Sequence, residues 1–103
     1  MLNFNLSVQP KTARRLKKAL EYSRDEETFA RSFLAYQVAE LRRAILNLRL
    51  EVKSFEEKYK MPSASFFKKF NQGKMDDSED FILWAGLCEM LEKNEVRLQG
   101  LEG

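Results

Sequence analysis

A single run of apolar residues with heptad spacing most constrains how this chain can fold. The run alternates steps of four and three residues, which is the spacing of a coiled-coil seam. Its members are Leu34, Val38, Leu41, Ile45, Leu48, Val52, Phe55 and Tyr59. Because neither Gly nor Pro occurs between Asp25 and Lys60, the sequence predicts one helix over residues 25–60, about 50 Å long. Such a helix needs partner helices, either from its own C-terminal third or from a second copy.

The last third of the chain carries a second apolar seam. Its members are Trp84, Leu87, Leu91, Asn94, Leu98 and Leu101. A cap formed by Asp76, Asp77 and Ser78 predicts that the helix carrying this seam covers residues 79–99. The two seams together predict an antiparallel helical hairpin in a C-terminal region over residues 51–103, with the long helix shared between both halves of the chain.

The connection between the two seams is predicted to hold a short helix. The residue before Pro62 is disfavoured in α geometry, so the long helix should end near Lys60. Ser63 is a suitable cap for the short helix, and Gly73 suits a left-handed residue at its end. This helix carries three aromatic residues, Phe66, Phe67 and Phe70.

The first eight residues alternate between apolar and polar side chains, which predicts a half-buried strand. A lone strand leaves its backbone groups unpaired, and the same strand of a second chain is the simplest partner. We therefore expect a homodimer, and a dimerisation and DNA-binding region over residues 1–50. The expected dimerisation residues are Leu2, Phe4, Leu6, Val8, Leu34, Val38 and Leu41.

A basic helix is predicted to follow the strand. Pro10 suits a first helical turn, and the helix should cover residues 11–22. Ser23 and Glu26 have the spacing of a capping box, which predicts that Ser23 caps the long helix. The basic residues before the first acidic residue, Glu21, are Lys11, Arg14, Arg15, Lys17 and Lys18.

The residue content argues against catalysis. The chain has no histidine, no glycine-rich phosphate loop and a single cysteine, so we expect no enzyme, no metal and no cofactor. Cys88 lies beside Leu87 and Leu91 and is expected to fill the core. One cysteine fits a reducing cytosol, and no apolar run approaches the ~20 residues that span a bilayer. We therefore expect a cytoplasmic protein without a membrane partner.

A strand, a basic helix, a turn and a second helix form an order that resembles the ribbon-helix-helix family. The resemblance implies a paired ribbon in the DNA major groove, with flanking phosphates bound by the basic helix. The turn between Leu20 and Phe29 lacks the family's frequent Gly, and three acidic residues stand at the start of the second helix. A ribbon used only for dimerisation is the alternative. The DNA-binding residues so implied are Asn3, Asn5, Ser7, Lys11, Arg14 and Arg15.

A second resemblance covers residues 57–91. It rests on the segment Tyr59–Phe66 and on Phe70, Gly73, Asp77, Asp80, Trp84 and Met90. These residues resemble the C-terminal region of small prokaryotic antitoxins encoded beside a toxin. The resemblance implies neutralisation of a toxin protein by direct binding, with repression of the module's own operon.

Both helices of the predicted hairpin carry more apolar residues than one seam can bury, which usually marks an interface. The sequence thus predicts an antitoxin-like homodimeric regulator that binds a toxin through its helical C-terminal region and operator DNA through its ribbon. The alternative is a dimeric helical scaffold or adaptor without DNA binding. The predicted partner-binding residues are Leu46, Leu50, Phe81, Leu83 and Met90. The alternative is that a second subunit, or the aromatic residues of the turn between the two seams, covers these side chains.

Overall fold

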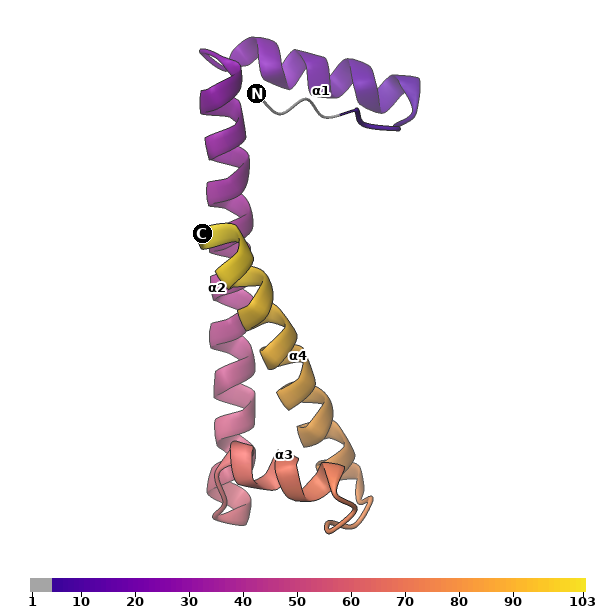
Figure 1. The fold of residues 1–103 in the computed structure, drawn as a ribbon, viewed down its shortest axis with the longest axis vertical. Helices are drawn as coiled ribbons and strands as arrows, with labels where there is room; N and C mark the ends of the chain where they lie inside the picture. Colours follow the sequence, from indigo (N-terminus) through magenta and orange to yellow (C-terminus); the bar gives the residue numbers. More distant parts are fainter. Residues whose placement is uncertain (1–4) are drawn as a thin grey trace. The chain divides into compact units, whose positions relative to one another are not determined.

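The computed structural model describes residues 5–103 and contains four α-helices in this part of the chain (Figure 1). They are α1 (Pro10–Tyr22), α2 (Glu26–Tyr59), α3 (Ser63–Asn71) and α4 (Glu79–Glu102). The chain divides into two compact units, of which the first ends at Ala35 and the second runs from Tyr36 to Gly103. The division falls within α2, and all buried residues of the described chain lie in the second unit.

The predicted N-terminal strand is wrong. Residues 5–9 form no regular secondary structure, and residues 5–103 contain no strand that could pair with them. Leu6 is 65% exposed and Val8 is 44% exposed, so neither side chain is held in a core. An alternating pattern yields a strand only where a neighbouring strand accepts its backbone hydrogen bonds. The fold class is therefore all-helical among the described residues, and the ribbon of the ribbon-helix-helix prediction is absent there. The predicted strand residues Leu2, Asn3 and Phe4 lie outside the described residues.

The start of α2 is capped differently from the prediction. The helix begins at Glu26, and the carboxylate of Asp25 accepts a hydrogen bond from the Thr28 amide at 2.7 Å. That bond lowers the pKa of the Asp25 carboxyl. Asp25 directly precedes the first helical residue, which is the N-cap position, whereas Ser23 lies two residues too early. The predicted capping box at Ser23 is therefore wrong, although the predicted start of the helix is confirmed to within one residue.

The end of α2 is a turn with a left-handed residue. Lys60 has φ = 55°, and the Met61 amide donates to the Glu56 carbonyl at 3.3 Å. This is the hydrogen bond of a Schellman motif, in which the left-handed position is usually Gly. Pro62 then prevents the helix from continuing. The predicted end of the long helix near Lys60 is confirmed.

The start of α3 is capped by a side chain from α2, and its end is followed by a left-handed residue. Ser63 is its first residue rather than its cap, and the Ser63 amide donates to the Glu56 carboxylate at 2.6 Å. Glu56 thus satisfies a helix-start donor that Pro62 has no side chain to satisfy. At the other end Gly73 is left-handed with φ = 73°, as predicted.

The core of the second unit is built around Trp84 and Phe66, both completely buried. Their rings stack with centroids 3.8 Å apart and an angle of 2° between the planes. The indole Nε1–H of Trp84 donates to Ser63 Oγ at 2.9 Å, which satisfies the polar end of a buried ring. Contacts between these two residues therefore fasten α3 to α4. The other buried residues are Ile45, Leu48, Val52, Ala85 and Leu87.

Within the second unit α4 runs antiparallel to α2, as the hairpin prediction expects. Asp80 at the start of α4 contacts Lys58 at the end of α2, and Glu102 at the end of α4 pairs with Arg42. Figure 1 shows α2 and α4 separating toward the end where α3 lies between them. Of the seam of α2, Ile45, Leu48 and Val52 are buried, and Phe55 and Tyr59 pack partly buried against the same core.

Candidate protein-binding site

The part of α2 in the second unit has apolar side chains on two faces. One face carries Ile45, Leu48 and Val52, which are buried in the core. Leu46 and Leu50, one turn apart on another face, are 58% and 60% exposed. A helix that serves only its own core has one apolar face and polar residues opposite. The second face is therefore available for a contact outside this chain.

Leu46 also lines a groove of about 500 Å³ between α2 and α4. Two ion pairs cross it: Arg42 with Glu102, and Arg49 with Glu95 at 3.5 Å. All four side chains are more than one third exposed, so these pairs add little stability and can exchange partners. The groove thus combines apolar lining with a charged rim, as protein interfaces do. Its remaining lining residues are Ile45, Leu98 and Gln99.

The outer side of α4 carries further exposed apolar residues. Leu83 and Met90 are each 54% exposed, as expected of partner-binding residues, and Ile82 is 56% exposed. Leu83 and Ile82 line a separate hollow together with Asp77 and Glu79. Ile82 is not among the partner-binding residues predicted from the sequence, because that prediction named only some of the apolar residues outside the seam. Its spacing of four residues to Gly86 and eight to Met90 is the signal that could have found it.

Phe81 does not belong to this exposed surface. Its ring packs edge-on against Tyr59 with centroids 5.0 Å apart, and lies 5.3 Å from the ring of Phe66. Phe81 is only partly exposed and packs against the core. Phe81 packs against Phe66 of α3. The spacing of apolar residues within α4 alone does not predict this contact.

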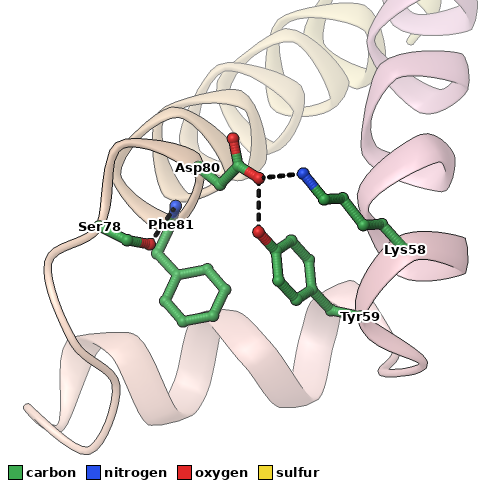
Figure 2. A network of polar contacts seen from close by, with 5 residues as sticks. All are labelled: Lys58, Tyr59, Ser78, Asp80 and Phe81. Atoms are coloured by element: carbon green, nitrogen blue, oxygen red, sulfur yellow. Dashed lines mark hydrogen bonds and ion pairs between the residues drawn. The ribbon is translucent and has the colours of Figure 1, made fainter.

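A polar network joins the end of α2 to the start of α4 (Figure 2). One carboxylate oxygen of Asp80 accepts hydrogen bonds from Lys58 Nζ at 2.7 Å and from the Tyr59 hydroxyl. The bonds from Lys58 and Tyr59 lower the pKa of the Asp80 carboxyl, and the same carboxylate raises the pKa of both donors. Ser78 beside it caps α4 by accepting from the Phe81 amide at 3.3 Å, as predicted. The network positions the two helices of the hairpin.

Cys88 lies at the margin of the core. It packs against the buried cluster and is half-buried. Burial raises the pKa of its thiol, so the reactive thiolate is disfavoured at neutral pH. This environment agrees with the expected role of Cys88 in filling the core.

The predicted DNA-binding residues are not assembled into one surface by a ribbon. Asn5 and Ser7 are exposed in a segment without regular structure, and Asn3 lies outside the described residues. Lys11, Arg14 and Arg15 are exposed on α1. Base recognition by strand side chains therefore has no structural support in the described part of the chain.

The expected dimerisation residues of α2 are only partly covered. Leu34, in the first unit, is 43% exposed. Val38 and Leu41, in the second unit, are half-buried. Their role between two copies stays a prediction.

Comparison with known proteins adds no family to this description, since no protein-family model, curated protein or solved structure matches the chain. The two resemblances seen in the sequence thus stay predictions. Among residues 5–103, no helix combines the length and the apolar character needed to cross a bilayer.

Proposed function

We propose that the chain acts by binding another protein through the second unit. The observation that carries this proposal is the pair Leu46 and Leu50, both more than half exposed on a helix whose other apolar face is already buried. Exposed leucines one turn apart are the anchors by which a helix face docks onto a partner. The second unit has a buried core of its own, so its fold does not depend on a partner. It can therefore present Leu46 and Leu50 before the partner binds.

The free energy gained by burying Leu46 and Leu50 is sufficient for a specific protein contact. Complete burial of a leucine side chain is worth about 1.5–3 kcal/mol. Leu46 and Leu50 are 58% and 60% exposed, so burying the rest of both side chains would together supply about 2–3.5 kcal/mol, which is the scale of an interface hot spot. Ion pairs at the rim of the neighbouring groove would set orientation more than affinity.

The partner class we propose is a toxin protein encoded by a neighbouring gene. Support comes from the resemblance of residues 57–91 to antitoxins, since this segment lies within the second unit. From Met61 onward the chain has eight acidic and five basic residues, and that balance suits a basic partner. The adaptor alternative uses the same leucines for a different protein.

A titration with matched variants tests this proposal. The full chain would be titrated by calorimetry with the purified product of the adjacent gene, as wild type and as Leu46→Ser/Leu50→Ser. Loss of about 3 kcal/mol of contact weakens the dissociation constant by roughly 100-fold. The control is Tyr22→Ser/Phe33→Ser, which removes two exposed aromatic residues of the first unit. We expect this control to bind as the wild type does.

Two results would count against the proposal. If the Leu46→Ser/Leu50→Ser variant bound with unchanged affinity, the site would lie elsewhere. If the wild type did not bind the neighbouring product, the antitoxin role would be refuted. Sedimentation equilibrium of the wild type and of the same variant would then test the adaptor alternative through self-association.

A further inference from the structure

Helix α1 gathers positive charge at its N-terminal end. Five basic residues lie between Lys11 and Lys18, and no acidic residue occurs before Glu21. All five basic side chains are exposed, and no residue of α1 is buried. None of the five forms an ion pair with another described residue, whereas Arg31 in the same unit pairs with Glu27. The positive charge of α1 is thus not neutralised within the part of the chain that the structure describes.

Four of these cations share one face of the helix. Lys11, Arg14, Arg15 and Lys18 stand at positions i, i+3, i+4 and i+7, which lie above one another on a helix. They extend over about 10 Å of the helix axis at 1.5 Å per residue. Phosphates along one strand of DNA follow at about 3.4 Å of rise, so the row matches about three nucleotide steps. The opposite side of α1 carries Leu16 and Leu20, with Ala13.

We propose that α1 binds the phosphate backbone of duplex nucleic acid without reading its base sequence. Two of the four cations are arginines, whose planar guanidinium groups suit phosphate oxygens. The first turn of α1 contains no acidic residue, and Gln9 makes no side-chain cap there. No carboxylate therefore competes with a phosphate at this end of the helix. Asn5 and Ser7 lie outside any strand, so within residues 5–103 no strand presents them to base edges.

A nucleic acid fits α1 better than an anionic membrane. Helices that lie in a membrane surface bury large apolar residues such as Trp, Phe and Leu. The side of α1 opposite the cations offers only Leu16 and Leu20 beside Ala13. That face is too small to hold the helix in a lipid layer by itself. Exposed cations, in contrast, supply essentially all of the free energy of non-specific binding to a nucleic-acid backbone.

The test is the salt dependence of binding by the full chain. A fluorescein-labelled 20-base-pair duplex would be titrated and followed by anisotropy between 50 and 200 mM KCl. Four neutralised phosphates predict a slope of about −3.6 in log K against log salt, and hence a loss of about 150-fold over this range. The variant Arg14→Gln/Arg15→Gln removes two contacts, so its slope should fall by about 1.8. Gln is a good helix former, and circular dichroism would verify that the helix content is kept.

Matched controls separate α1 from the rest of the chain. Arg43→Gln/Lys53→Gln removes two exposed cations of α2 and should leave the slope unchanged. A second duplex of unrelated sequence should bind with the same affinity. Leu46→Ser/Leu50→Ser should also bind the duplex normally, so a failure of the protein-binding proposal is distinguishable from a failure of this one.

Three outcomes would overturn the inference. One is an equal slope for the wild type and the Arg14→Gln/Arg15→Gln variant. Another is a tenfold or larger difference between the two duplexes, which would demand base recognition. The third is binding to vesicles rich in phosphatidylserine without binding to either duplex, which would assign the cationic face to a membrane.

Discussion

Two leucines two residues apart on α2 should respond very differently to the same substitution. Leu48 is 7% exposed and belongs to the core, whereas Leu46 is 58% exposed. Leu48→Ala removes buried side-chain atoms and leaves a cavity, which costs about 2–5 kcal/mol. Leu46→Ala removes atoms that already face water, so its effect should stay within about 0.5 kcal/mol. A unit of this size has a total stability of about 3–10 kcal/mol, so Leu48→Ala should remove a large part of it.

Urea unfolding measures this difference directly. Trp84 is the only tryptophan and is completely buried, so its fluorescence reports on the core of the second unit alone. The free energy of unfolding would be extrapolated to water for the wild type and for each alanine variant. We expect a strong loss for Leu48→Ala and almost none for Leu46→Ala, with similar slopes on urea concentration.

Comparable destabilisation by the two substitutions would refute this assignment of faces. It would mean that the side chain of Leu46 is covered in solution. Repeating the urea unfolding at several protein concentrations would show whether a second copy of the chain covers Leu46. If it does, the unfolding midpoint rises with protein concentration.

Three further perturbations test local features of the second unit, with Trp84 fluorescence as the readout. Lys60→Gly should raise the free energy of unfolding by up to about 1 kcal/mol, because Gly adopts the left-handed conformation without strain; a decrease would contradict the strain. Ser78→Ala removes the cap of α4 and should cost about 1 kcal/mol, against no change if water replaces it. The lowered pKa of Asp80 means that its bonds stabilise the fold above about pH 4 and are lost as the pH falls further. Asp80→Asn should therefore differ from the wild type at pH 6, and this difference should shrink as the pH falls below about 4; a difference that does not change with pH would contradict the network.

The helices could be predicted from the sequence because their ends depend on neighbouring residues. Pro10 and Pro62 restrict the backbone where they stand, Gly73 supplies a left-handed residue, and Ser78 caps the helix that follows it. The seam of α2 also predicted the residues that enter the core from Ile45 onward. Each of these predictions required only local geometry and the period of the apolar pattern.

The strand and the place of Phe81 could not be predicted in the same way. A strand exists only with a hydrogen-bonding neighbour, so the alternation of the first eight residues was not sufficient. Phe81 was assigned to the surface because it lies beside the seam, but α3 brings Phe66 against its ring. The position of α3 depends on the stack of Phe66 on Trp84, a contact between residues 18 apart in the sequence. Both cases depend on contacts between segments that are distant in the sequence, and the spacing of residues within one segment does not predict such contacts.

The central claim is that Leu46 and Leu50 contact a partner protein. Methyl NMR of the leucine-labelled full chain, recorded with and without the product of the adjacent gene, tests it most directly. We predict that the signals of Leu46 and Leu50 shift or broaden on binding, while that of the buried Leu48 keeps its position. Binding that shifts the methyl signals of Leu16 and Leu20 on α1, and leaves Leu46 and Leu50 unchanged, would contradict the account.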